Sequence, residues 1–140
     1  MNMKHDVKNV YLSFSRRDER TAIRIAKELR SLGFVVWDDF QIAAGANWAV
    51  QVAEALERAD AIVLLISPEY LASQWAQREI EYALSTAKFK GRVIPVMLRP
   101  TRDVPWILET FQRIDATPGR RNVGKHIAEA LRSSAEVGSH

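Results

Sequence analysis

Apolar runs that suit buried β-strands alternate along this chain with segments whose apolar residues recur at helical spacing. The strands are expected over residues 8–13, 34–37, 61–66, 92–98 and 112–116. The third run is apolar at every position, which is typical of a central strand covered on both faces. The pattern therefore predicts an α/β fold, a three-layer sandwich with a five-stranded parallel sheet and helices on both faces. Units of this length favour the flavodoxin-like strand order 2-1-3-4-5.

Capping and breaking residues set the expected ends of the helices. Asp18 is expected to cap the first helix, and Gly33 to end it in the left-handed conformation that suits glycine. Ser67-Pro68 predicts another helix start, with a capping hydroxyl followed by proline in the first turn. Asn122 is expected to cap the last helix. Pro95 lies inside the fourth strand, where it removes a ladder donor, so we expect a local irregularity there.

Composition is that of an ordinary globular protein of 140 residues, expected to form one domain over 8–132 with tails at 1–7 and 133–140. The net charge of +3 is not gathered into a basic stripe, which argues against direct nucleic-acid binding. Without cysteine, disulfides and thiol chemistry are excluded, and the three scattered histidines suggest no metal site. We see neither a secretory signal nor an apolar run long enough for a membrane, so the expected location is the cytoplasm.

The expected topology brings three loops to one edge of the sheet. In sheets of this order, ligands bind outside the carboxyl ends of the strands, near the switch point between the first and third. Residues 14–17 follow the first strand, the segment from Asp38 follows the second, and Ser67 follows the third. We therefore expect these segments to rim a single crevice.

The helix expected to begin at Ser67-Pro68 carries an aromatic residue and an acid on one face, because Trp75 and Glu79 are four positions apart. Glu79 falls at the edge of the apolar arc of this helix, whereas Glu81 points to solvent. An acid at such a border is more readily desolvated, and desolvated carboxylates often carry chemistry. The spacing alone equally suits a packed tryptophan beside a surface acid. The apolar arc consists of Ala72, Ala76, Ile80, Ala83 and Ala87.

Several segments together resemble the TIR (Toll/interleukin receptor) domain in its bacterial form. They occur in the family's order over nearly the whole chain, which makes the resemblance specific, and the family tolerates a proline in its fourth strand. The segments are VYLSFSRRD at 10–18, GFVVWD at 33–38, GANW at 45–48, LISPEYLASQW at 65–75 running into Glu79, and IPV at 94–96.

The resemblance implies one of two functions. Some TIR domains are adaptors that signal only by self-association. Others cleave NAD+ at the nicotinamide–ribose bond, giving nicotinamide and ADP-ribose or a cyclic isomer, and carry a glutamate in a Trp-x-x-x-Glu arrangement. Glu79 fills that position with Trp75 in place, which implies an NAD+ hydrolase with Glu79 as the catalytic residue, NAD+ as its substrate and no cofactor. The residues expected to bind substrate are Phe14, Arg16, Asp38, Trp48 and Trp75.

The chemistry of this reaction agrees with the residues present. Nicotinamide leaves a pyridinium as a neutral molecule, so no general acid is needed, unlike in a glycosidase with paired carboxyl groups. One carboxylate beneath the cationic ribose is sufficient, as electrostatic partner or transient nucleophile. Arg16 is expected to pair with ribose or pyrophosphate oxygens, and Asp38 with a ribose hydroxyl; a solvated arginine and a loop-capping acid remain alternatives. Trp75 would stack on a ring or wall the pocket, while burial is the expected role of Trp48.

The resemblance also implies assembly, because enzymatic family members complete their pocket with a neighbouring domain. It points to the Asp38–Asn47 loop as the surface for a homo-oligomer or filament. It further implies bacterial antiphage signalling, with a sensor or effector domain or protein as an additional partner. A non-enzymatic assembly module and a nucleoside deoxyribosyltransferase remain alternative interpretations. A response-regulator receiver shares the strand order but needs acids where this chain has Ser13 and Ser67.

Overall fold

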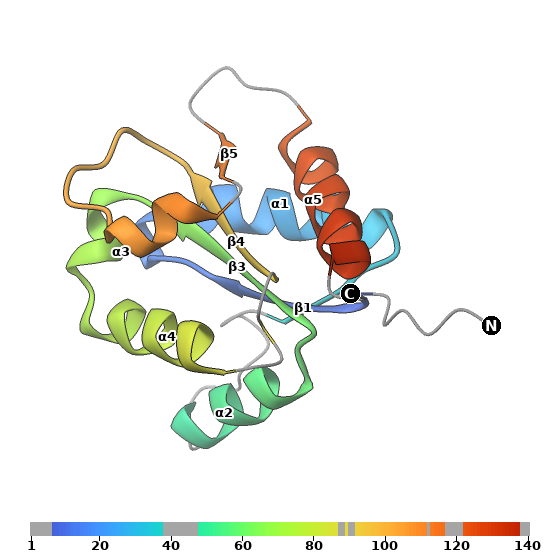
Figure 1. Cartoon of the computed structure of the whole chain (residues 1–140), viewed down its shortest axis with the longest axis horizontal. Helices are drawn as coiled ribbons and strands as arrows, with labels where there is room; N and C mark the ends of the chain where they lie inside the picture. Colours follow the sequence, from blue (N-terminus) through green and yellow to red (C-terminus); the bar gives the residue numbers. More distant parts are fainter. Residues whose placement is uncertain are drawn as a thin grey trace.

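The computed structural model describes residues 7–37, 48–86, 89, 92–111, 113–116 and 122–137, with the backbone alone for 48, 49, 75, 109, 110 and 134–137. Five strands form one parallel sheet in the order β2-β1-β3-β4-β5, which confirms the predicted fold class and strand order (Figure 1). The strands are β1 (Asn9–Ser13), β2 (Val35–Trp37), β3 (Ala61–Ile66), β4 (Val93–Met97) and β5 (Ile114–Asp115).

Helices cover both faces of this sheet. In Figure 1, α1 and α5 lie on one face, and α2 and α4 lie on the other. No helix among the described residues is both long enough and apolar enough to cross a membrane. The helices are η1 (Arg16–Asp18), α1 (Glu19–Ser31), α2 (Trp48–Arg58), α3 (Pro68–Ala72), α4 (Gln74–Ser85), η4 (Trp106–Thr110) and α5 (Val123–Val137).

Alternation along the strands divides the buried side chains into two cores. Every residue of β3 is buried, as expected for a central strand covered on both faces. The core beneath α1 and α5 includes Val10, Leu12, Ile25, Leu29, Val63, Leu65, Val96, Ile127 and Leu131. The core beneath α2 and α4 includes Tyr11, Val52, Leu56, Ile62, Leu64, Ile66, Tyr70, Ile80 and Phe89.

The ladder between β3 and β4 is regular around Pro95, so the expected irregularity is wrong. Pro95 is buried opposite Leu64, and the pairing continues on both sides of it, from Ile62 with Val93 to Ile66 with Met97. The pairing with β5 begins only at Val96. Pro95 is therefore tolerated because, at this position, β4 has a described strand partner on one side only.

Gly33 ends α1 with φ of +99°, which confirms the predicted left-handed position. Asp18 does not have the predicted role of a helix cap. It precedes α1, but its side chain makes no capping hydrogen bond. That carboxylate is buried and bound to other segments of the chain.

The helix expected to run from Ser67-Pro68 past Glu79 is broken in two. Ser67 caps α3 as predicted, by accepting a hydrogen bond from the Tyr70 backbone N–H, and Pro68 occupies the first turn. The backbone is extended at Ser73, whose hydroxyl then caps α4 by accepting from the Ala76 N–H. A single amphipathic arc through this segment is therefore wrong, because the chain changes direction at Ser73.

The start of α5 is held by another helix. Asn122 precedes α5 with φ of +60°, and the α5 N–H group of Gly124 donates to Glu28 Oε2 of α1 at 2.7 Å. The α5 backbone continues to Val137, beyond Ser133 where a terminal tail was expected. The limits of the domain itself, 8–132, stay a prediction.

Candidate functional site

Three polar side chains from three segments meet where β1 ends. Ser13 is the last residue of β1, Tyr70 lies on α3, and Glu79 lies on α4. They are 2%, 1% and 5% exposed. Ser13 Oγ lies 3.0 Å from Glu79 Oε1 and 2.6 Å from the Tyr70 hydroxyl. We call Ser13, Tyr70 and Glu79 the hydroxyl–carboxylate cluster.

Local structure explains how these residues converge. Successive strand residues point to opposite faces, so Ser13 lies on the same side of β1 as Tyr11, facing the α2/α4 core. The corner at Ser73 turns the chain between Tyr70 and Glu79. Gln77 stabilises this corner by donating from Nε2 to the Leu71 carbonyl at 3.0 Å. The two short helices thus bring a tyrosine and a glutamate to the same strand end.

A second polar network lies at the same edge of the sheet. Asp18 is 3% exposed and accepts hydrogen bonds from Ser67 Oγ at 2.6 Å and from Arg99 Nη1 at 2.7 Å. Arg99 also pairs with Glu69 through its other terminal nitrogen. These contacts connect the start of α1, the end of β3, α3 and the segment after β4.

The two networks share helix α3. Ser67 Oγ donates to Asp18 and accepts from the Tyr70 backbone N–H at 3.1 Å, while the Tyr70 side chain contacts Ser13. Buried polar groups are stabilised when such bonds are complete, and they then hold the surrounding segments in one arrangement. Tyr70 is therefore fixed through both its backbone and its ring.

Glu69 of the second network has a displaced pKa. A hydrogen bond within its own backbone unit, and then the neighbouring Arg99 guanidinium, lower the pKa of this carboxyl below its ordinary value of 4.5. Both effects favour the charged carboxylate, and they outweigh the opposing effect of desolvation. Glu69 is thus held ionised beside Arg99.

The TIR domain family matches this chain over residues 10–134, which is most of its length. The chain belongs to the TIR domain family. The 2′ cyclic ADP-D-ribose synthase BtTIR of Bacteroides thetaiotaomicron is 26% identical over 96 residues, which are 66% of this chain. The chain spans a third, 33%, of the length of that relative.

Two solved structures of other TIR proteins have the same fold. A metazoan TIR-STING receptor from C. gigas, solved with 2′,3′-cGAMP, is similar with a TM-score of 0.76 at 24% identity, covering 94% of this chain and 41% of the receptor. The TIR domain of the Toll-related receptor TRR-2 from Hydra magnipapillata gives a TM-score of 0.73 at 18% identity, covering 92% and 98%. At these identities the likenesses show the fold alone.

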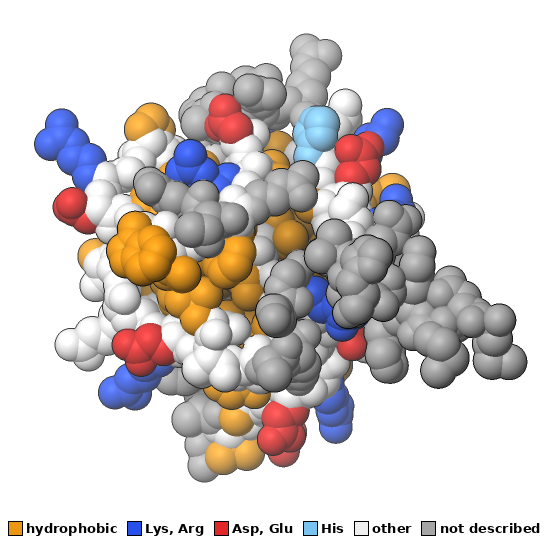
Figure 2. Space-filling view, in the orientation of Figure 1, with side chains coloured by type: hydrophobic (Ala, Val, Ile, Leu, Met, Phe, Trp, Pro, Cys, Tyr) orange, Lys and Arg blue, Asp and Glu red, His pale blue; other side chains and the backbone are white. Residues whose placement is uncertain are grey.

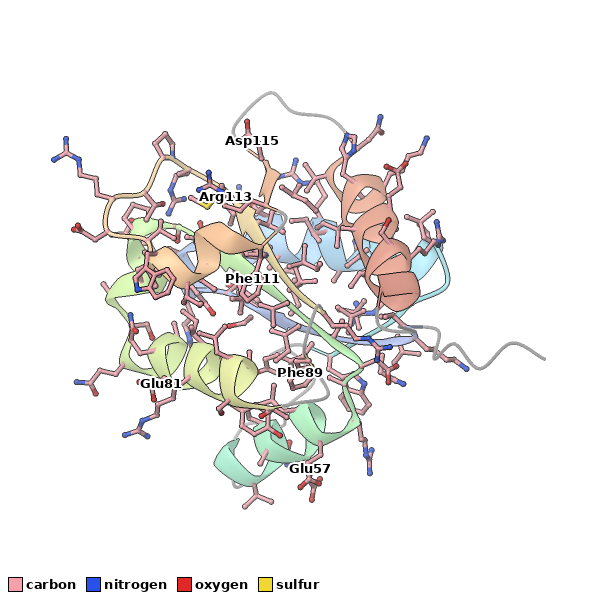
Figure 3. The ribbon with its side chains drawn as sticks, in the orientation of Figure 1. Glu57, Glu81, Phe89, Phe111, Arg113 and Asp115 are labelled. Carbon is pink, nitrogen blue, oxygen red and sulfur yellow. The ribbon has the colours of Figure 1, made fainter. Side chains whose placement is uncertain are left out.

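The TIR domain places Glu79 and Glu81 as the sequence suggested. Glu79 is buried toward the sheet, whereas Glu81 is exposed on the outer side of α4 (Figure 3). Two residues apart on one helix, these acids therefore have opposite surroundings.

Of the other expected site residues, the structure describes the side chains of Phe14 and Arg16. Phe14 is half-buried against the α1/α5 core, across the sheet from Glu79, and Arg16 is exposed on η1. Trp48 and Trp75 begin α2 and the first turn of α4, with their backbones alone described. Asp38 and the loop to Asn47 lie outside the described residues.

Ser13, Tyr70 and Arg99 are residues of this edge that the sequence did not single out. Ser13 carried a signal, because it is a small polar residue ending an apolar strand at the expected switch point. Tyr70 and Arg99 carried none, since their partners are 57 and 81 positions away along the chain.

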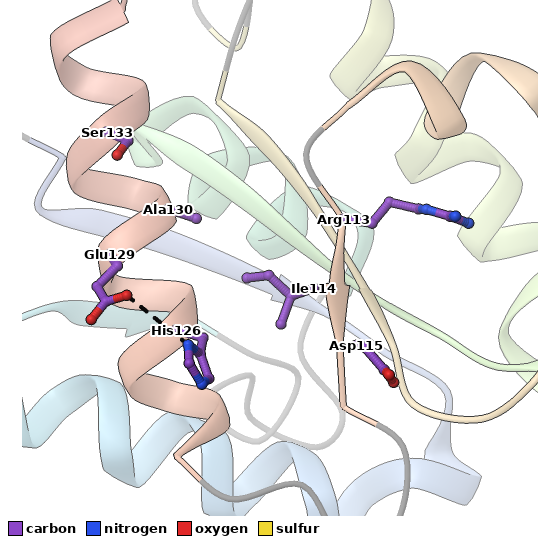
Figure 4. Close-up of a pocket in the computed structure, with 7 residues that line it drawn as sticks. All are labelled: Arg113, Ile114, Asp115, His126, Glu129, Ala130 and Ser133. Carbon is purple, nitrogen blue, oxygen red and sulfur yellow. Dashed lines mark ion pairs between the residues drawn. The ribbon is translucent and has the colours of Figure 1, made fainter.

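A separate cavity of about 360 Å³ lies between β5 and α5 (Figure 4). Ile114 lines it from β5, and on α5 His126 Nδ1 lies 4.0 Å from Glu129 Oε2. This cavity opens on the face that α5 covers, so it is distinct from the hydroxyl–carboxylate cluster. Among the described residues, no group of three histidine or acidic side chains is placed to hold a metal ion.

Proposed function

We propose that this TIR domain cleaves the bond between nicotinamide and ribose in NAD+, with Glu79 as the catalytic carboxylate. The products are nicotinamide and ADP-ribose or a cyclic isomer of it. The observation that carries the proposal is Glu79 itself, an acid 5% exposed at the end of β1, beside the switch point of the sheet. The name of the Bacteroides relative, a cyclic ADP-ribose synthase, supports the same bond as the target.

The reaction needs little besides a fixed negative charge. The carbon–nitrogen bond breaks with both electrons leaving on nicotinamide, which departs as a neutral ring. Positive charge develops on the ribose, and a carboxylate held in a site of low dielectric stabilises it strongly. Water, or an atom of the ADP-ribose itself, then attacks the anomeric carbon and closes the reaction with the loss of a proton.

In this proposal the remaining site residues bind the rest of NAD+. Arg16 on η1 is exposed at the same edge of the sheet and free to reach ribose or pyrophosphate oxygens. Phe14, Asp38, Trp48 and Trp75 complete the proposed contacts, together with a neighbouring domain supplied by self-association through residues 38–47. We place the activity in bacterial antiphage signalling in the cytoplasm, under the control of a separate sensor.

Replacing Glu79 tests the proposal directly. Glu79→Gln keeps the shape and removes the charge, so nicotinamide release from NAD+ should fall about 100-fold or more, in line with about 3 kcal/mol of lost transition-state stabilisation. The rate is measured by chromatography of free nicotinamide.

Glu81→Gln is the matched control, because it makes the same change two residues along α4 at an exposed position. It should keep the wild-type rate. Circular dichroism of all three proteins shows whether they are equally folded. Equal rates for folded Glu79→Gln and wild type would overturn the assignment.

A further inference from the structure

We propose that Tyr70 and Ser13 are positioning residues that act as a two-step chain of hydroxyl donors, fixing the Glu79 carboxylate for its reaction. The inference rests on the function proposed above, and it assigns work to two residues outside the Trp-x-x-x-Glu arrangement. Neither hydroxyl is proposed to touch NAD+. Both act through Glu79.

The direction of the chain follows from counting hydrogens. Ser13 has a single hydroxyl hydrogen and two acceptor lone pairs. When Glu79 is ionised it can only accept, so the Ser13 hydrogen points to Oε1 across the 3.0 Å contact. The Tyr70 hydroxyl must then be the donor in its 2.6 Å contact with Ser13. A negative charge on Glu79 therefore orients the Ser13 hydroxyl toward the carboxylate and, through it, the Tyr70 hydroxyl toward Ser13.

Hydrogen bonds in a row strengthen one another, since each donor becomes a better donor when it also accepts. Tyr70 thus strengthens the hydrogen bond from Ser13 to the carboxylate by donating to the Ser13 hydroxyl oxygen. The anchors of the chain are rigid: Ser13 belongs to a strand paired on both sides, and Tyr70 is held by its backbone bond to Ser67. The hydrogen bond from Ser13 therefore fixes the Glu79 carboxylate to the sheet, in addition to its attachment to α4.

The surroundings of the hydroxyl–carboxylate cluster are largely apolar. Packed on this side of the sheet are Val52, Leu56, Leu64, Ile66 and Ile80, from α2, β3 and α4. This core also contains Tyr11 from β1, Tyr70 from α3 and Tyr82 from α4, and Arg58 stacks on Trp37 at its edge. At the same sheet edge, the acids Asp18 and Glu69 both pair with Arg99. In these apolar surroundings, each hydrogen bond donated by a hydroxyl is electrostatically stronger than it would be in water.

Two single variants and their combination test the chain. Ser13→Ala removes the direct donor and should lower kcat about tenfold or more, while Tyr70→Phe removes the remote donor and should lower it about two- to tenfold. KM should stay within about twofold for both, because neither group contacts NAD+. In the Ser13→Ala background, Tyr70→Phe should have almost no further effect, since the path from Tyr70 to Glu79 is already broken.

Tyr82→Phe is the matched control. Tyr82 lies on α4 in the same core, edge-on to Phe89 with ring centroids 6.1 Å apart. Removing its hydroxyl makes the same chemical change as Tyr70→Phe and should leave kcat and KM unchanged. If the fold-losses in kcat of Ser13→Ala and Tyr70→Phe multiplied in the double variant, the two residues would act independently and the chain would be overturned. A loss of kcat in Tyr82→Phe equal to that in Tyr70→Phe would also overturn it.

A readout without NAD+ separates this inference from the proposed function. In protein labelled with ¹³C at glutamate side-chain carboxyl carbons, the Glu79 signal is assigned by its disappearance in Glu79→Gln. Losing the Ser13 donor destabilises the charged form, so the midpoint of this signal's titration should move to higher pH by about one unit. Tyr70→Phe should move it in the same direction by less, and Tyr82→Phe not at all.

The two readouts fail separately. A wild-type protein that releases no nicotinamide contradicts the proposed function, yet the titration still decides whether Ser13 and Tyr70 control Glu79. Conversely, an unchanged titration in Ser13→Ala overturns the donor chain even when Glu79→Gln abolishes activity.

Discussion

Asp18 connects segments at one edge of the sheet through hydrogen bonds of its carboxylate. Its position just before a helix had predicted only a helix cap. Its carboxylate binds Ser67 and Arg99 while its side chain is 2% exposed. Sequence position alone could not distinguish the two roles, because both place an aspartate just before the first helical turn. The role of Asp18 is set by its contacts with Ser67 and Arg99, which lie 49 and 81 positions away along the chain.

Removing this carboxylate should destabilise the fold. Asp18→Ala leaves the buried Ser67 hydroxyl without its acceptor and is expected to cost about 1–3 kcal/mol in urea unfolding. Arg99 contributes less to this loss, because its side chain is 40% exposed and can turn to water. Asp18→Asn keeps an acceptor for Ser67 and should cost less than Asp18→Ala. An Asp18→Ala protein within about 0.5 kcal/mol of wild type would contradict this role.

Glu69 should make the stability depend on acid. Because its pKa is lowered in the folded state, its contribution is present above the ordinary value of 4.5 and is lost as the pH falls through the folded pKa. The stability difference between wild type and Glu69→Gln, measured by urea unfolding, should therefore be present at neutral pH and vanish in acid. Salt should also reduce it, since the pair is exposed to solvent. A difference that grows on acidification would contradict the sign.

Glu79 stood out in the sequence as a candidate because two independent patterns, helical spacing and strand topology, pointed to it. The structure adds what neither pattern contains, namely that Ser13 and Tyr70 contact one another and that Ser13 reaches the acid. Such contacts depend on the corner at Ser73, where one helix ends and the next begins. The apolar spacing of this segment continues across Ser73, so it did not predict a break between two helices. The buried position of Glu79 was thus predictable from the sequence, whereas its contacts with other segments were not.

At the scale of elements, the close approach of α1 and α5 depends on Gly124. A Cβ atom there would lie 2.3 Å from Glu28 Oε2 and 2.5 Å from Glu28 Cβ, distances that real side chains do not tolerate. The same approach lets Glu28 accept from the Gly124 N–H and hold the first turn of α5. A glycine inside a helix, otherwise unfavourable, is here required by packing.

Gly124→Ala therefore tests the helix contact. On propensity alone, alanine at this position in the first turn would stabilise the helix by at most about 1 kcal/mol. We expect net destabilisation of about 1–3 kcal/mol in thermal or urea unfolding, because the two helices must separate. Lys125→Ala, an exposed change at the next position of α5, should be nearly neutral. A Gly124→Ala protein more stable than wild type would show that α1 gives way easily.

Elements with strong local signals were predicted closely. The apolar run of β3 and the glycine after α1 match the structure because burial on both faces and positive φ leave direct marks on sequence. The order of the strands was predicted from the alternation of strands and helices along the chain. The regular ladder at Pro95 was not predictable, since it depends on where the neighbouring β5 begins to pair.

At the scale of the molecule, an apolar surface lies beside η4. Trp106 is 74% exposed, and Val104, Ile107 and Phe111 next to it are only partly covered (Figure 2). Such a surface is compatible with the self-association proposed above.

If a neighbouring domain completes the site, the NADase rate should rise faster than in proportion to protein concentration. The rate of nicotinamide release is measured over about a hundredfold range of concentration, with light scattering of the same samples to follow their mass. A strictly proportional rate from a species of constant mass would argue against required self-association.

The central claim is that one buried carboxylate in this fold breaks the nicotinamide–ribose bond. Its most direct test is to incubate wild-type protein and Glu79→Gln, both at the highest attainable concentration, with NAD+ and to separate the products by chromatography. The account predicts nicotinamide in equal amount to ADP-ribose and its cyclic forms from wild type, and neither from Glu79→Gln. Intact NAD+ after incubation with the folded, assembled wild-type protein would contradict it.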